Sequence, residues 1–248
     1  MIDTHYENPR LAALYDLDSG WSIDRDFYLA LAHQGGLKVL DLGCGTGLLA
    51  DAYARKKNTV TGVDPAQAML AVARQKPFGA QIEWVQSPAQ TYDSQKRFDL
   101  IIMTGHAFQV LLEDSDVLAT FAVMKKHLKP GGLIVFESRN PLVNWASRWD
   151  YQMELTLPST TVLESRHLLS MEGNRMRFEL RYQFQDGACE TLSSISELRF
   201  FSREEIEAHL KESGLYVETL LGGWRGEPFD ESDSEEMIFK VRAAYTRE

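Results

Sequence analysis

The chain has 248 residues, of which 44% are hydrophobic and 25% charged, enough for one α/β domain with an insertion or for two small domains. Its formal net charge of -10 argues against a nucleic-acid partner, because affinity for phosphates depends largely on Lys and Arg. The first residues carry no basic-then-apolar signal, and no apolar run reaches membrane-spanning length. We therefore expect a cytoplasmic protein without a membrane partner, as a monomer or a homodimer. Its two cysteines, Cys44 and Cys189, have no metal-ligand spacing and are expected as free thiols, with no metal site.

Residues 1–35 precede the first predicted strand and are expected to form one or two short helices, a helical cap. From residue 38 to about residue 140, predicted strands and helices then alternate. Strands are expected at 38–42, 59–63, 81–86, 98–103 and 133–137, and helices at 47–57, 65–76 and 115–128. The last two strands are apolar on both faces, as a parallel sheet covered by helices requires, and Pro130-Gly131-Gly132 is expected to break the chain between helix and strand.

The period changes after residue 140. Residues 176–184 alternate apolar and polar side chains, with turn signals at 172–174 and 185–187 and partner strands expected at 160–171 and 188–200. This pattern predicts an antiparallel meander with one apolar face, and we expect residues 144–200 to form an insertion on the substrate side.

The chain then returns to the main domain. Ser202 and Glu205 form a capping-box pattern that begins a helix ending at Gly214. Strands at 216–221 and 237–243 bring the main sheet to seven strands. The predicted fold is a doubly wound, mostly parallel α/β sheet of residues 36–143 and 201–248, with an antiparallel β meander inserted.

A glycine loop follows the first strand. Asp41 precedes Gly43, Gly45 and Gly47, and a helix comes next, which is the layout of a nucleotide-binding βαβ unit. Leu48 stands where a dinucleotide fingerprint has its third glycine. An acid before the loop would repel a pyrophosphate but suits a cationic amino group. The loop therefore indicates a nucleoside that carries an amino acid, S-adenosylmethionine (SAM).

Asp64 ends the second predicted strand, where neighbouring strand ends open into one crevice. Its carboxylate could accept hydrogen bonds from ribose hydroxyls. The alternative is an N-cap for the helix that begins at Pro65.

Within residues 37–137, four motifs follow one another in the order that is typical of a known family. They are 43–47 (Gly-Cys-Gly-Thr-Gly), 63–65 (Val-Asp-Pro), 98–101 (Phe-Asp-Leu-Ile) and 128–132 (Leu-Lys-Pro-Gly-Gly). The chain resembles the class I SAM-dependent methyltransferases, which implies a Rossmann-like methyltransferase fold.

The resemblance also implies roles for single residues. Asp41 would hold the methionine amino group through water or backbone, and Gly43, Cys44 and Gly45 would let the backbone approach the cofactor. Asp64, with Pro65 beside it, would bind ribose. The remaining implied contacts are Met69 on adenine, unless it is a helix core residue, the Thr104 carbonyl on the methionine moiety, and Tyr6 or Tyr15 covering the cofactor.

The chain departs from the family at the adenine edge. The family commonly has Gly-Asp-Ala after the third strand, whereas this chain has Ser87-Pro88-Ala89-Gln90. The acidic contact to the adenine amino group must then come from Gln90 or a backbone group, or be absent. The Ala89 N–H could still meet an adenine ring nitrogen.

His106 follows the fourth strand, where an acceptor should meet the sulfonium, and it could act as a general base. It could equally line the pocket or bind the cofactor. Cys44 is better explained as a small buried residue than as a reactive thiol. An acceptor pocket could be walled by aromatic side chains that are otherwise packing residues, with Arg139 or Arg148 able to pair with an acidic group: Trp145, Trp149, Tyr151 and Trp224.

The predicted function is SAM-dependent methylation of a small molecule at N, O or C. The alternatives are methylation of protein side chains, a SAM-binding sensor or partner subunit without turnover, and a nicotinamide-dependent oxidoreductase, against which Leu48 counts.

Overall fold

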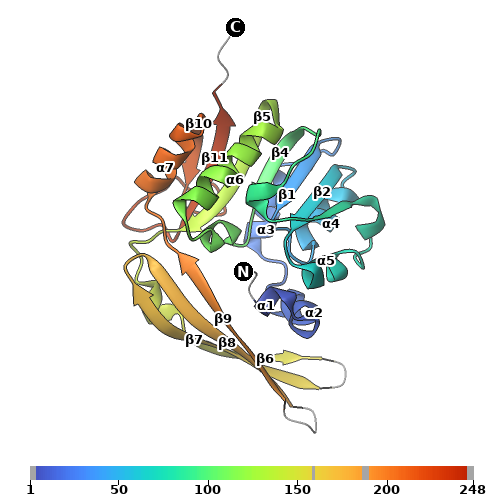
Figure 1. Ribbon diagram of the computed structural model, residues 1–248, viewed down its shortest axis with the longest axis vertical. Helices are drawn as coiled ribbons and strands as arrows, with labels where there is room; N and C mark the ends of the chain where they lie inside the picture. Colours follow the sequence, from blue (N-terminus) through green and yellow to red (C-terminus); the bar gives the residue numbers. More distant parts are fainter. Residues whose placement is uncertain (1–3, 158–159, 186–189, 245–248) are drawn as a thin grey trace.

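In the computed structural model, which describes residues 4–157, 160–185 and 190–244, two sheets are connected by the chain that passes between them (Figure 1). The larger sheet has seven strands in the order β10-β11-β5-β4-β1-β2-β3, and the smaller has four in the order β6-β7-β8-β9. The predicted fold class, a doubly wound, mostly parallel sheet with an antiparallel insertion, is confirmed. The division into three segments at residues 35, 143 and 200 stays a prediction.

The larger sheet is built as the sequence pattern indicates. Its strands are β1 (Lys38–Leu42), β2 (Thr59–Asp64), β3 (Glu83–Gln86), β4 (Phe98–Met103), β5 (Leu128–Arg139), β10 (Leu215–Leu221) and β11 (Glu236–Ala243). Strands β1 to β5 pair in parallel, and β11 runs antiparallel to both β5 and β10. As a result, the carboxyl ends of β1, β2, β4 and β5 share one edge with the start of β11.

Helices cover both faces of this sheet. Side chains from α6 (Asp114–His127) and α7 (Arg203–Glu212) share one core cluster with Leu40, Ile101 and Phe136. The opposite cluster joins α3 (Ile23–Ala30) and α4 (Leu48–Arg55) to Val39 and Ile102. Neighbouring residues of one strand therefore face different helix layers, which explains why the central strands are apolar throughout.

The Pro-Gly-Gly segment does not separate helix from strand as expected. β5 already begins at Leu128, directly after α6, and includes residues 130–132. The pairing with β4 shifts there, because Phe98 faces Leu128 whereas Leu100 faces Leu133. Pro130 lacks an N–H, so this stretch bulges from the ladder before regular pairing resumes.

The insertion contains one strand more than expected. β7 (Thr161–Glu172), β8 (Arg175–Phe184) and β9 (Thr191–Arg199) form the predicted meander, and β6 (Tyr151–Thr156) adds an edge strand. Only Leu155 of β6 is buried, so its sequence lacks the alternation that reveals β8. The turn and strand start predicted at 186–189, including Cys189, lie outside the described residues.

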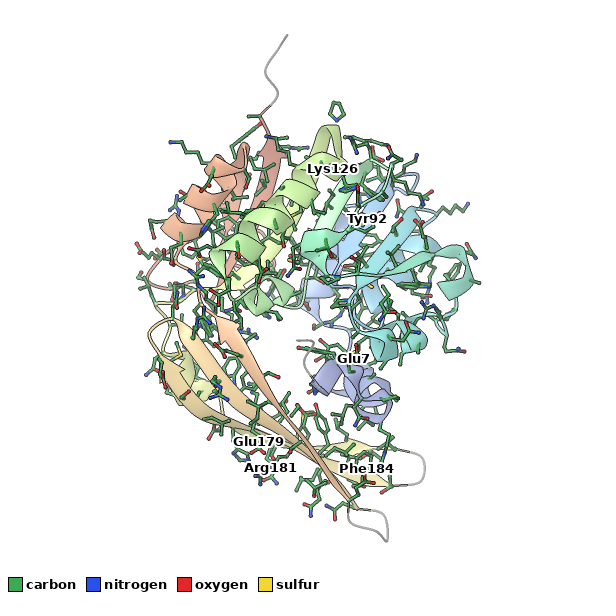
Figure 2. All side chains as sticks on the ribbon, viewed as in Figure 1. Glu7, Tyr92, Lys126, Glu179, Arg181 and Phe184 are labelled. Carbon is green, nitrogen blue, oxygen red and sulfur yellow. The ribbon has the colours of Figure 1, made fainter. Side chains whose placement is uncertain are left out.

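Three short helices precede the larger sheet: α1 (Thr4–Glu7), α2 (Pro9–Asp18) and α3. α1 and α2 lie between the two sheets (Figure 1), and α2 packs on α5 (Gln67–Ala73), with Ala12 and Met69 in one cluster. The guanidinium carbon of Arg10 lies 3.8 Å from the ring centroid of Phe184, which Figure 2 shows toward the far end of the insertion. No helix in the described part of the chain is long and apolar enough to cross a membrane.

Candidate active site

The glycine loop between β1 and α4 has the conformation that only glycine adopts readily. Gly43, Gly45 and Gly47 have φ values of 74°, 53° and 70°. A Cβ at Gly47 would lie 2.5 Å from the Trp84 ring, whereas a Cβ at Gly45 would meet no atom within 4 Å. Gly47 is thus required for packing. The open space at Gly45 fits the predicted approach of a ligand to the backbone.

Asp41 is buried near the end of β1, and one of its oxygens has no partner in the part of the chain that the structure describes. Its side chain is 2% exposed, and its Oδ1 accepts no hydrogen bond within the described residues. Burial, and then the negative charge of Asp64, raise the pKa of Asp41 to about 7, against the lowering effect of Arg25. An unpaired buried carboxylate is costly. The site therefore fits a cationic group such as the amino group of SAM.

Asp64 lies beside the loop at the end of β2. Its Oδ2 accepts the Gly45 N–H and its Oδ1 accepts the Ala66 N–H, both at 2.8 Å. Burial raises the pKa of Asp64, and the two backbone bonds partly oppose that. Asp64 is not the helix N-cap, because α5 begins at Gln67 with Ala66 as its cap. The carboxylate holds the loop against the strand end, and its contact with a ribose stays a prediction.

Two other predicted cofactor contacts, Met69 and the Thr104 carbonyl, already have partners within the protein. Met69 is 1% exposed and packs in the cluster with Tyr6 and Tyr15, so it has the helix core environment considered above. The Thr104 carbonyl already accepts the Ala107 N–H at 3.3 Å. Their contacts with a cofactor stay predictions.

At the adenine edge, Ala89 and Gln90 form a short 3-10 turn after β3. Pro65 is close to that strand, because its carbonyl accepts the Gln86 amide at 3.3 Å. Burial raises the pKa of the Cys44 thiol well above its ordinary value, which fits an inert side chain.

His106 lies at the end of β4 in a left-handed backbone conformation, with φ of 60°. Its Nε2 is 3.0 Å from both carboxylate oxygens of Glu236, and its backbone N–H donates to Glu137 at 2.7 Å. Glu137 also accepts the Tyr28 hydroxyl, and burial raises the pKa of Glu137. Neither Glu137 nor Glu236 was predicted from the sequence, although an acid that ends the apolar run of β5 is a recognisable signal.

A cavity of about 530 Å³ opens between the helical cap and these strand ends. Tyr15, Arg25, His106 and Arg139 line it, together with further residues of 17–24 and Gly105. Arg25 was also missed. The glycine loop itself is covered by α2, whose Asp16 accepts hydrogen bonds from Thr46 and Lys76.

The predicted acceptor wall is divided by the structure. Trp145 and Trp149 lie near Arg139, whereas Trp224 packs against Phe27 and Tyr28 of α3. The Tyr151 hydroxyl donates to buried Glu164. Within the described residues, no group of His, Cys, Asp and Glu is arranged to hold a metal ion.

Comparison with known proteins places this site in a family. Residues 39–132 match the model of a methyltransferase domain. This segment, which holds the glycine loop, Asp64 and His106, therefore belongs to the methyltransferase domain family, and the resemblance to class I SAM-dependent methyltransferases is confirmed.

Relatives extend the match to different degrees. The ubiquinone biosynthesis O-methyltransferase of Pseudomonas putida (strain GB-1) is 35% identical over 116 residues, covering 44% of this chain. The chain spans only about half of that relative, 48% of its length. The cypemycin N-terminal methyltransferase of a Streptomyces species is 24% identical over 208 residues, 84% of each chain.

A sugar N-methyltransferase from Streptoalloteichus sp. ATCC 53650 has the same fold over most of its length. It superposes with a TM-score of 0.76 at 20% identity, covering 93% of both chains. The likeness therefore includes the insertion as well as the methyltransferase domain.

The burial of Asp41 predicts an unusual pH dependence of stability. Because folding raises its pKa from 3.8 to about 7, the unfolded state gives up this proton more readily, and the free energy of unfolding falls as pH rises between these values. Asp41→Asn should remove this loss and stabilise the ligand-free protein at pH 8 by up to about 4 kcal/mol, with little gain at pH 4. Urea unfolding at both pH values measures the difference.

Asp99→Asn is the matched control, because at pH 8 it should change the free energy of unfolding in the opposite direction. Asp99 accepts hydrogen bonds from Lys129, which hold its pKa below the ordinary value. Its contribution to stability is present above pH 4 and lost on acidification, so this variant should be destabilised at pH 8. A destabilised Asp41→Asn protein at pH 8 would contradict an uncompensated carboxylate at position 41.

Proposed function

We propose that the protein is a SAM-dependent methyltransferase acting on a small molecule at N, O or C. The observation that carries the proposal is the unpartnered Oδ1 of Asp41, buried beside a glycine loop of the methyltransferase domain family. When bound, SAM supplies an electrophilic methyl group on a sulfonium. The chain's own residues then have to bind the donor, align the acceptor and take up a proton.

Three charged residues suit the donor. Asp41 provides an acceptor for the amino group, and Asp64 provides oxygens for the ribose hydroxyls. Arg25 supports binding of the carboxylate, because it lines the cavity and its charge acts on Asp41. Its guanidinium donates to the Ser19 carbonyl at 2.9 Å, which holds it in place. The amino group and carboxylate of an amino acid share one carbon, so their partners must be neighbours.

His106 is the candidate base. Both oxygens of Glu236 lie against Nε2, so Nδ1 is the ring nitrogen that remains to take up a proton from an acceptor. His106 lines the cavity, and Glu236 positions its ring. Methyl transfer also depends on in-line alignment of donor and acceptor, for which a cavity lined by residues of the cap and of the strand ends is suited.

Ligand binding and methyl transfer test the proposal directly. S-adenosylhomocysteine should raise the Tm, and NAD should not, because Leu48 replaces the third glycine of a dinucleotide loop. Transfer of a labelled methyl group from SAM to small molecules would separate an enzyme from a binding protein without turnover. Stabilisation by NAD alone would refute the proposal, and labelling of protein substrates only would favour the protein methyltransferase.

Two variants should separate the binding of the ribose from the binding of the amino-acid carboxylate in the donor site. Asp64→Ala should weaken both S-adenosylhomocysteine and 5′-methylthioadenosine, which keeps the ribose but lacks the amino acid. Arg25→Met should weaken only S-adenosylhomocysteine, by roughly 10- to 100-fold for a lost charge-assisted bond. Calorimetry measures both affinities.

Arg148→Met serves as the control, because Arg148 is exposed and pairs with Glu235 at the surface. Equal weakening of both ligands by Arg25→Met would show that Arg25 does not bind the carboxylate.

A substitution at position 106 tests the base. Asparagine tolerates a positive φ, so His106→Asn should fold normally. With an acceptor found by the labelling screen, we expect kcat to fall by roughly 100-fold or more while the Kd for S-adenosylhomocysteine is unchanged. An unchanged kcat would mean that the imidazole only lines the pocket.

A further inference from the structure

Arg139 is a half-buried cation that forms no ion pair with any residue that the structure describes. It is the last residue of β5, and its Nη1 donates to the Gln109 side-chain oxygen at 2.9 Å. Within residues 4–157, 160–185 and 190–244, no carboxylate forms an ion pair with it. Burial lowers the pKa of Arg139 to about 10, so the guanidinium remains charged at neutral pH.

The guanidinium is held in a fixed position by neutral groups. Its carbon lies 5.5 Å from the ring centroid of Trp145 and 5.3 Å from that of Trp149. Gln109, its hydrogen-bond partner, is fully buried. One of five N–H donors is used by this contact, so a planar, ordered fork remains for a ligand.

The nearest acids are already engaged. Glu236 stands opposite Arg139 in the β5–β11 pairing, but both of its oxygens lie at His106 Nε2. Glu137 accepts one hydrogen bond at each oxygen, from Tyr28 and from the His106 backbone. These acids raise the pKa of Arg139 from a distance without occupying its donors.

Arg139 lines the same cavity as His106 and Arg25. Arg25 acts on Asp41 at the end of β1, where the donor's amino acid is expected. Arg139 belongs instead to the β5–β11 side, near the candidate base. The cavity thus has one cation for the donor and a second that the donor does not need.

We propose that Arg139 binds a carboxylate group of the methyl acceptor. This inference rests on the proposed methyltransferase function. A carboxylate matches the guanidinium fork in two parallel hydrogen bonds. A phosphate dianion fits less well, because no lysine lines the cavity and Asp18 and Asp24 do line it.

Binding of simple anions tests the assignment without knowledge of the acceptor. Benzoate, titrated into protein saturated with S-adenosylhomocysteine, should change the tryptophan fluorescence saturably, since Trp145 and Trp149 lie beside Arg139. In Arg139→Met the Kd should rise roughly 10- to 100-fold. Arg139→Lys should recover part of the affinity, and Arg203→Met, at an exposed arginine of α7 that pairs with Glu207, should behave as the unchanged protein.

Several outcomes would overturn the inference. They are the absence of a saturable benzoate response, an equal response in Arg139→Met, or tighter binding of inorganic phosphate than of benzoate. The affinity for S-adenosylhomocysteine, measured in the same variants, should not change, and a loss in Arg139→Met would assign this arginine to the donor. Failure of S-adenosylhomocysteine to bind the unchanged protein would instead refute the proposed function.

Discussion

The structure depends on placing negative charge at one edge of a parallel sheet. Asp41, Asp64 and Glu137 lie at or near the carboxyl ends of three strands there, and Glu236 begins a fourth that runs in the opposite direction. Backbone N–H groups, a tyrosine and a histidine satisfy three of these carboxylates. Of these four acids, Asp41 alone keeps a buried oxygen that has no partner among the described residues. The unpaired carboxylate of Asp41 lowers the stability of the ligand-free protein, and a bound cation at this position would restore it.

The fold could be predicted from the sequence because local signals agreed with the global topology. The β1 loop glycines, the apolar runs of β4 and β5 and the alternation in β8 each specify one arrangement. The edge strand β6 was not predicted, because an exposed strand with one buried residue has no periodic hydrophobic pattern. Pro130 was predicted to lie before the strand and lies within it, because proline and glycine occur both in bulges within a strand and in breaks before one.

Only part of the candidate site could be predicted from the sequence, and the reason differs from that for the fold. Loop-and-strand motifs fix Asp41 and Asp64 relative to the sheet, so their places follow from the topology. Arg25 lies on a cap helix, and Glu236 is 130 residues from His106 in the chain. Their meeting depends on tertiary packing, for which short sequence patterns carry no information. The acceptor side is therefore where a single sequence is least informative.

The left-handed backbone of His106 narrows what this position can become. Glycine, asparagine and aspartate occupy that conformation with little strain, whereas branched or bulky side chains would require the loop after β4 to be rebuilt. Among proteins that share the fold, the chemistry performed at this strand end can thus diverge in small steps only within a short list of side chains. A change outside that list would have to be accompanied by a new loop.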